Sequence, residues 1–233
     1  MVTDSSEPVV QTRNLGKSVD TVDGRLTILD GIDMHVDPGE ALAVLGASGS
    51  GKSTLLGLLA GLDQPSSGEV RLFGNSLMPL DEDGRAALRS GRVGFVFQSF
   101  QLLPGMTALE NVMLPLELAG HESPETAAAH ALEEAGLGRR FHHYPAQLSG
   151  GEQQRVAVAR AFAPGPDVLF ADEPTANLDA RTGERVADLL FDLRRRAGAV
   201  LVLVTHDAAL ARRCNRRLYL HEGRLADGLG DIG

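Results

Sequence analysis

The sequence predicts an α/β fold with a mostly parallel sheet, an antiparallel β layer near the N-terminus and an inserted helical subdomain. Near-continuous apolar runs of strand length predict the parallel sheet, because strands buried on both faces carry little polar alternation. Helical patterns after these runs indicate α/β alternation. A long middle stretch with helical patterns but no convincing strand predicts the insertion.

The N-terminal layer is predicted from short strand-like stretches at 9–15, 32–36 and 69–73. The sequences TVDGR, DPGE and PSSGE between them are rich in turn residues. Short strands joined by such turns favour antiparallel pairing.

Four apolar runs predict the parallel strands: ALAVL (41–45), VGFVF (93–97), DVLFA (167–171) and VLVLVT (200–205). Helical patterns follow three of them, in STLLGLLAGL, RTGERVADLLFDLRRR and DAALARRC. The middle stretch instead contains TALENVMLPLELAG, SPETAAAHALEEAGL and GEQQRVAVARAFA, separated by proline and glycine. We therefore expect residues 1–233 to form a single domain, with the core in 1–98 and 164–233 and the helical subdomain in 99–163.

Composition limits the class of protein. The chain has 233 residues and a net charge of −9, which argues against nucleic acid as the main partner. It has no apolar run of membrane-span length, no signal-peptide pattern at its start, and one cysteine, Cys214. These features favour a reducing cytoplasm. We interpret the basic clusters at 194–196 and 211–217 as solvated or helix-terminal charge.

The sequence GASGSGKST (46–54) matches the phosphate-binding pattern G-x-x-x-x-G-K-[ST] and lies between a predicted strand and a predicted helix. Backbone amides of such a loop point at phosphate oxygens. Lys52 suits the β- and γ-phosphates and Ser53 suits Mg²⁺. Lysine occurs elsewhere only at Lys17, so a chain that otherwise uses arginine has a point charge here. The expected phosphate-loop residues are Gly46, Ala47, Ser48, Gly49, Ser50, Gly51, Lys52, Ser53 and Thr54.

Polar residues follow three of the buried runs, where ligands of open α/β sheets bind. Asp172 suits Mg²⁺, and Glu173 suits the base or water-positioning residue for attack on a γ-phosphate. Both acids also suit ordinary helix capping. His206, after VLVLVT, is a catalytic candidate, and Gln98 suits Mg²⁺ or the attacking water.

A second glycine-rich helix start occurs in LSGGEQQR (148–155). Ser149 and Glu152 have the spacing of a capping box, which explains the helix start. Gly150 and Gly151 each cost about 0.8–1.0 kcal/mol of helix propensity relative to alanine. Capping does not require them, whereas close approach of an anion to the backbone amides does.

Together, GASGSGKST, Gln98, LSGGEQQR, VLFADEPTANLDA and VTHD resemble the ATP-binding subunits of ABC transporters over nearly the whole chain. FVFQSFQLLPGMTALENV and PAQLSGGEQQRVAVARAF are similar to the subgroup of LolD, YbbA and the ATPase domain of MacB. GFVFQSF, DVLFADEPT and GKSV look closest to the YbbA type.

The resemblance implies ATP and Mg²⁺ as cofactors, with Ser53, Gln98 and Asp172 at the metal and Glu173 as the catalytic carboxylate. It implies that His206 contacts the γ-phosphate and that Gln98 opens a loop that senses nucleotide and touches the membrane partner. Ser149, Gly150 and Gly151 would cover the ATP held by a second copy, and Asp179 would lie in the crossing loop. A homodimer around two ATP molecules follows from this arrangement.

The resemblance also implies a separate integral membrane permease, which would place the chain on the cytoplasmic face of the membrane. Lipoprotein or lipophilic-substrate export and mechanotransmission are the activities of the subgroup. The alternatives are a soluble ABC-type ATPase acting on nucleic acid or the ribosome, and a P-loop kinase or regulator. LSGGEQQ and the adjacent acids argue against the last.

Two positions depart from the family pattern. Family members usually stack adenine on an aromatic residue near Ser18–Val19, where this chain has none. Because base–aromatic stacking contributes about 1–3 kcal/mol, we expect weaker or less base-selective nucleotide binding. Ala176 replaces a glycine common in the subgroup, a small change.

Overall fold

The computed structural model describes residues 7–22 and 24–226, which divide into two compact units. Residues 88–199 form one unit, and the rest of the described chain forms the other. We call them the second and the first unit, respectively. The second unit contains the whole stretch 99–163 together with flanking strands and a helix, so the boundaries expected for a helical subdomain remain a proposal.

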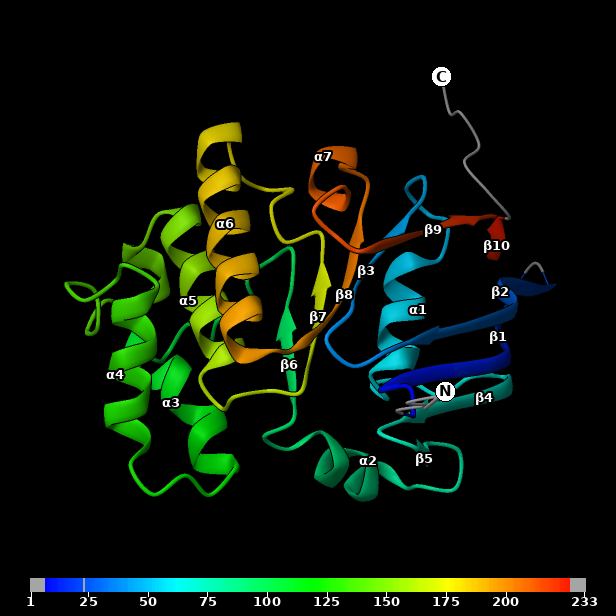
Figure 1. The fold of residues 1–233 in the computed structure, drawn as a ribbon, viewed down its shortest axis with the longest axis horizontal. Coiled ribbons are helices and arrows are strands. Elements are labelled where there is room, and N and C mark those ends of the chain that lie inside the picture. Colours follow the sequence, from blue (N-terminus) through cyan, green and yellow to red (C-terminus); the bar gives the residue numbers. More distant parts are fainter. Residues whose placement is uncertain (1–6, 23, 227–233) are drawn as a thin grey trace, which may run out of the picture. The chain divides into compact units, whose positions relative to one another are not determined.

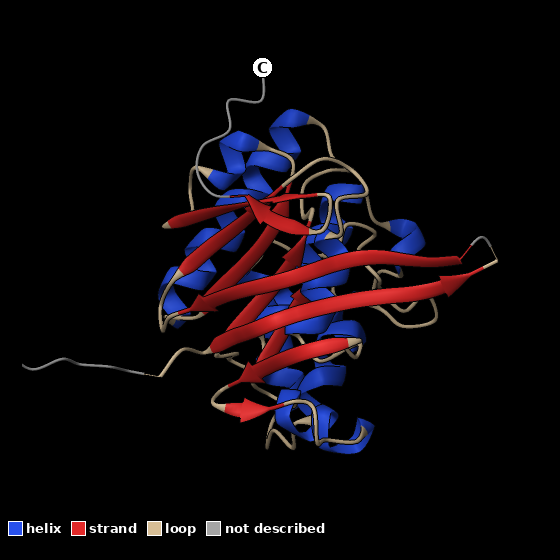
Figure 2. Ribbon diagram, turned by 90° about the vertical axis from the view of Figure 1, so that its right-hand side faces the viewer, coloured by secondary structure: helices blue, strands red, loops and turns tan. Residues whose placement is uncertain are grey.

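The first unit contains an antiparallel sheet in the order β2-β1-β4-β5. Its strands are β1 (Val10–Thr21), β2 (Gly24–Val36), β4 (Ser67–Leu72) and β5 (Asn75–Ser76). Figure 2 shows β1 and β2 as two long strands side by side. The expected antiparallel layer is confirmed, but β1 and β2 extend well beyond the predicted stretches. Their outer halves are mostly exposed and therefore lack an apolar signal.

The first unit also contains strands in the order β10-β9-β3-β8. Strand β3 (Ala41–Leu45) runs parallel to β8 (Val200–Thr205) and to β9 (Arg216–His221), and β10 (Arg224–Ala226) is antiparallel to β9. Both β3 and β8 are buried along their whole length, as their continuous apolar runs predicted. Our prediction did not delimit β9 and β10, because β9 begins with two arginines and alternates in burial.

Helix α1 (Lys52–Leu59) follows β3 and buries four leucines. Helix α7 (Ala208–Ala211) follows β8 and is shorter than the predicted stretch 207–214. Helix α2 (Glu82–Arg89), which was not predicted, is strongly amphipathic and begins with two acidic residues.

The second unit contains the parallel pair β6 (Val93–Val96) and β7 (Val168–Asp172) and its helices α3 (Ala108–Leu118), α4 (Pro124–Glu134), η1 (Pro145–Gln147), α5 (Gly150–Phe162) and α6 (Ala180–Ala197). Residues 99–163 are all described and contain no strand, as predicted. In Figure 1, α3, α4 and α5 lie together. Their shared core includes the buried side chains of Val112, Leu116, Leu132, Leu137 and Val156.

Local signals set the helix ends of this unit. Thr107 and Glu110 form a capping box at α3, and Asp179 caps α6. Gly198 ends α6 in the left-handed region at φ 66°. The arginines at 194–196 lie in the last turn of α6, which agrees with their interpretation as helix-terminal charge.

Within the described part of the chain, every helix is too short or too polar to cross a bilayer.

Candidate nucleotide-binding and catalytic site

The predicted phosphate loop lies between β3 and α1 and wraps around its lysine. The Nζ atom of Lys52 donates hydrogen bonds to the carbonyl oxygens of Gly46 and Ala47, both at 2.8 Å. Lys52 is only 8% exposed. The ammonium group is therefore held inside the loop, where it can add positive charge to an anion bound there.

The start of α1 fits a phosphate group. Its N-cap residue is Gly51, at φ 100°, and no side chain of the described residues caps the first-turn N–H groups. The loop is open at Gly49, whose φ is 80°, because a Cβ built there would meet no atom within 4 Å. Uncapped amides at a helix start favour an anion, because they lack intrahelical acceptors and lie at the positive end of the helix dipole.

His206 lies beside the phosphate loop in the first unit. The paired strands β3 and β8 end in register, with Leu45 opposite Thr205. Gly46 and His206 are the next residues on their strands, so both leave the sheet at the same edge. Asp207 then accepts a hydrogen bond from the backbone N–H of Ala209 at 2.7 Å and starts α7. The predicted placement of His206 at a strand end is thus confirmed.

In the second unit, a similar register brings Gln98 and the adjacent acids together. Val96 of β6 pairs with Ala171 of β7, and Asp172 ends β7. Asp172 and Glu173 are partly buried. Gln98 and the two acids therefore lie at the same edge of this strand pair.

The side chain of Gln98 is tied to the loop after Glu173. Its Nε2 atom donates to Oδ1 of Asn177 at 3.4 Å, and Nδ2 of Asn177 donates to the Gln98 carbonyl at 3.1 Å. Sequence reasoning missed Asn177, although the residue lies inside the quoted motif VLFADEPTANLDA. The amide oxygen of Gln98 is the atom that would face a cation or water.

Glu173 has a backbone conformation that few residues adopt. Its φ is 44°, in the left-handed region that favours glycine and asparagine. Such a conformation costs on the order of 1–3 kcal/mol and is often found at functional sites. The Ala176 N–H donates to the Glu173 carbonyl at 3.2 Å, which closes the turn.

The predicted capping box at the start of α5 is confirmed. Ser149 Oγ accepts from the Glu152 N–H at 3.3 Å, and the Ser149 N–H donates to Glu152 Oε2 at 2.9 Å. Arg140 Nε donates to Glu152 Oε1 at 2.8 Å. These contacts lower the pKa of Glu152 to about 2, and the hydrogen bond from Arg140 has the largest effect. The carboxylate therefore stays ionised at the start of α5.

The two glycines of this helix start differ, which corrects part of the sequence argument. A Cβ built on Gly151 would lie 2.2 Å from Cγ2 of Thr182, so packing within the chain already favours glycine there. A Cβ on Gly150 would meet its nearest atoms at an ordinary 3.7 Å. Only Gly150 therefore lacks a structural reason and supports an anion at this helix.

Asp179, which the family resemblance places in a crossing loop, also has a structural role. Its Oδ1 accepts from the Thr182 N–H at 3.1 Å and caps α6. The hydrogen bonds from the Thr182 side chain and backbone lower the pKa of Asp179. Thr182 thus lies against both Asp179 and Gly151.

The expected metal ligands have suitable chemistry. Ser53, Gln98 and Asp172 offer hydroxyl, amide and carboxylate oxygens, which Mg²⁺ prefers. Ser53 belongs to the first unit, and Gln98 and Asp172 belong to the second. The donor set fits the ion.

The strand position expected for an aromatic residue carries an aliphatic one. Val19 of β1 is 36% exposed, and its cross-strand partner Leu26 of β2 is 55% exposed. Farther along β2, the Ile28 carbonyl oxygen lies 3.0 Å from a Cβ built on Gly51. The β1–β2 hairpin therefore contacts the phosphate loop and presents an aliphatic pair.

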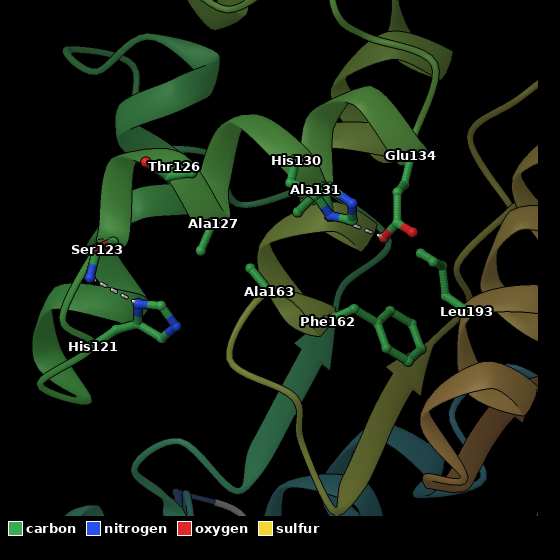
Figure 3. A pocket seen from close by; sticks show the side chains of 11 residues that line it. His121, Ser123, Thr126, Ala127, His130, Ala131, Glu134, Phe162, Ala163 and Leu193 are labelled. Carbon is green, nitrogen blue, oxygen red and sulfur yellow. Dashed lines mark hydrogen bonds and ion pairs between the residues drawn. The ribbon is translucent and has the colours of Figure 1, made fainter.

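A pocket of about 400 Å³ in the second unit contains none of the predicted site residues. Figure 3 shows its polar rim, where His121 accepts from the Ser123 N–H and His130 lies 3.7 Å from Glu134. The remaining lining residues are Thr126, Phe162, Leu193 and four alanines. These two histidines, read from the sequence as surface residues, have local partners.

A phosphate loop between a buried strand and an uncapped helix, a strand-end acid pair and a capped SGG helix start together define an ABC-type ATP-binding subunit. The chain belongs to this family, since the family model described as ABC transporter matches residues 29–176.

Similarity to individual proteins narrows the subgroup. The chain is 56% identical over 224 residues to YbbA of Escherichia coli (strain K12), an uncharacterised ABC transporter ATP-binding protein, covering 95% of this chain and 98% of YbbA. It is 47% identical over 226 residues to the lipoprotein-releasing system ATP-binding protein LolD of Xanthomonas campestris pv. campestris (strain 8004), covering 96% and 95% of the two chains. The predicted LolD- and YbbA-like subgroup is thereby confirmed.

The fold is similar to that of a solved cassette. The ATP-binding cassette MJ0796, in a dimeric post-hydrolysis state bound to ADP and Pi, matches with a TM-score of 0.88 and 39% identity. The match covers 96% of this chain and 99% of MJ0796. The predicted fold class is confirmed.

Proposed function

We propose that the chain hydrolyses ATP as a dimer and thereby drives a separate membrane permease. The observation that carries this proposal is the start of α1, where a buried lysine lies in a loop that leads to uncapped helix amides, an arrangement that suits an anion. Because the chain belongs to the ABC family, the anion we propose is the phosphate chain of ATP. The dimeric state described for MJ0796 supports assembly in pairs.

Each ATP would lie between two copies of the chain. Lys52 and the loop amides would bind its phosphates, and Ser149 and Gly150 of the other copy would cover the γ-phosphate. Ser53, Asp172 and Gln98 would hold Mg²⁺, which when bound would supply positive charge against the phosphates. Glu173 would accept a proton from the attacking water, and His206 would donate a hydrogen bond to the γ-phosphate. Hydrolysis would then remove the group that joins the copies.

The cargo is proposed from the relatives. LolD is named for a lipoprotein-releasing system, so a permease that exports lipoproteins or other lipophilic substrates is the class we propose. Mechanotransmission across the membrane is the second activity of this kind. Through the permease the chain would sit on the cytoplasmic face of the membrane.

Two variants test the chemistry and the assembly. Glu173→Gln should stop phosphate release while ATP-dependent dimers accumulate, measured by light scattering. Ser149→Arg should stop hydrolysis while leaving nucleotide binding nearly intact. A Glu173→Gln chain that stays monomeric at saturating ATP, even with the permease, would contradict the dimer model. Loss of nucleotide binding in Ser149→Arg would place the signature at the same chain's ATP.

A mixed dimer separates the two arrangements directly. Lys52→Ala and Ser149→Arg chains are each expected to be inactive. Mixed, they form one site with an intact phosphate loop from one copy and an intact signature from the other. Recovery of phosphate release on mixing supports the shared site. A mixture as inactive as its components contradicts it.

Co-purification from detergent extracts tests the partner. Recovery of an integral membrane protein supports the proposal, and recovery of ribosomes or DNA supports the soluble ABC-type ATPase instead. The net charge of −9 disfavours the latter.

A further inference from the structure

The loop that follows β6 is fastened by side chains from other segments of the second unit. Four of its carbonyl oxygens accept hydrogen bonds from three side chains. The pairs are Gln154 Nε2 to Phe97 O at 3.3 Å, Asn177 Nδ2 to Gln98 O at 3.1 Å, Arg160 Nη2 to Phe100 O at 3.0 Å and Arg160 Nη1 to Gln101 O at 2.6 Å. Two of the three donors, Gln154 and Arg160, belong to helix α5.

Arg160 holds a strained part of this loop. Phe100 and Gln101 have φ values of 60° and 48°, both in the left-handed region. Consecutive non-glycine residues seldom adopt this conformation, since each costs on the order of 1–3 kcal/mol. One planar guanidinium contacts both carbonyls, which a lysine ammonium does less well. The loop therefore depends on α5 for its shape.

Gln154 joins two strand ends through one amide group. Its side chain is fully buried, and Nε2 donates to Pro174 O at 2.6 Å as well as to Phe97 O. Phe97 precedes Gln98, and Pro174 follows Glu173. Both hydrogens of the amide are used, so glutamine suits this place better than a residue with one donor. The same helix begins at the signature residue Ser149.

We propose that Gln154 and Arg160 are positioning residues, which tie the signature helix to the loop that carries Gln98 and, through Pro174, to the turn after Glu173. This inference rests on the proposed function. The signature of one chain would bind one ATP of the dimer, whereas its Gln98 and Glu173 would serve the other. A phosphate engaged at the start of α5 would then bias the placement of Glu173, and Gln154 would couple the two sites.

Gln154→Met tests the coupling, because methionine fills similar volume without donors. The matched control is Gln153→Met, since Gln153 is the neighbouring residue on α5 and its Nε2 donates to Leu148 O, at the start of its own helix, at 3.1 Å. For Gln154→Met we expect kcat to fall roughly 10- to 100-fold with little change in KM for ATP, as for a misplaced catalytic group. The Hill coefficient for ATP should fall towards one. Gln153→Met should behave as the natural chain in both respects.

Hydrogen exchange tests the fastening without any hydrolysis. The amides of Phe100 and Gln101 donate within the loop, at 3.2 Å to Phe97 O and 2.6 Å to Ser99 O, so their exchange reports its opening. We expect faster exchange in Gln154→Met and in Arg160→Lys, and none of this change in Gln153→Met.

The two measurements distinguish a failure of the proposed function from a failure of this inference. If the natural chain releases no phosphate, the proposed function is wrong, and exchange alone decides whether α5 fastens the loop. If Gln154→Met does not fold, Arg160→Lys decides. Exchange of Phe100 and Gln101 at the natural rate in the folded variants overturns the inference, as does a kcat equal to that of Gln153→Met.

Discussion

Gly151 of α5 lies so close to Thr182 of α6 that a Cβ at position 151 would come within 2.2 Å of the threonine methyl carbon. The contact joins the signature helix to the helix that Asp179 caps. It also means that one glycine of the pair is held by packing, whatever the pair binds.

We therefore expect the two glycine substitutions to have different effects. Gly151→Ala should lower the free energy of unfolding by about 1–3 kcal/mol, the usual cost of overpacking. Gly150→Ala has room for its methyl group and should fold normally, yet lower phosphate release if an anion approaches there. Urea unfolding and phosphate release measure the two effects.

A second change identifies the cause. Thr182→Ser removes the methyl group that a new side chain at position 151 would strike, and it should restore most of the stability of Gly151→Ala. A double variant as unstable as the single one would show that the contact is not the reason. Full activity in Gly150→Ala would remove the support that this glycine gives to an anion site.

The helix start at Ser149 shows how much of such a site the sequence alone predicts. The capping box at Ser149 was predictable because its two residues are three apart and act locally. The contact with Thr182 was not, because it joins residues distant in the sequence. For the same reason Gln154 and Arg160 were missed, since their partners are carbonyl groups of a remote loop.

The strands also divide into those that local sequence predicts and those whose position depends on distant partners. The wholly buried strands β3 and β8 have continuous apolar sequences and were predicted within a residue. Strand β9, with its basic start, takes its place from pairing with β3 and has only a weak signal of its own. The far ends of β1 and β2 are exposed, so their sequence resembles a loop although they pair with each other.

The strained turn at Glu173 predicts a trade of stability against activity. Glu173→Asn should unfold at higher urea than Glu173→Gln, because asparagine tolerates the left-handed region better, with a gain of up to about 1 kcal/mol. Both variants are uncharged and both should lack hydrolysis. Equal unfolding midpoints for the two would show that the turn at φ 44° stores no such strain.

The lowered pKa of Glu152 predicts that part of the free energy of unfolding depends on pH in the acid range. Its pKa in the folded chain is lowered from 4.5 to about 2, mainly by Arg140 and the Ser149 amide. Ionised Glu152 thus contributes stability that is fully present above pH 4.5 and is lost as the pH falls towards 2. The difference in free energy of unfolding between the natural chain and Glu152→Gln should be constant near neutral pH and shrink as the pH falls from 4.5 towards 2.

Urea unfolding at several pH values measures this difference. Arg140→Met, which removes the first cause of the shift, should shrink it at neutral pH as well. A difference that does not change between about pH 6 and pH 3 would contradict the lowered pKa, because at about pH 3 an unshifted glutamate is mostly protonated.

The aliphatic pair on the β1–β2 hairpin predicts a gain from an aromatic side chain. If adenine lies over Val19, as the family pattern implies, Val19→Tyr should bind ATP more tightly by about 1–3 kcal/mol, or roughly 5- to 150-fold in Kd. The control is Val22→Tyr, since Val22 lies fully exposed on the same hairpin. Equilibrium titration with ATP, and with ribose triphosphate lacking the base, separates stacking from phosphate binding. Stacking requires that Val19→Tyr improve only the ATP affinity and that Val22→Tyr improve neither. Equal gains for both ligands would place the effect at the phosphate loop, which the same hairpin contacts through Ile28.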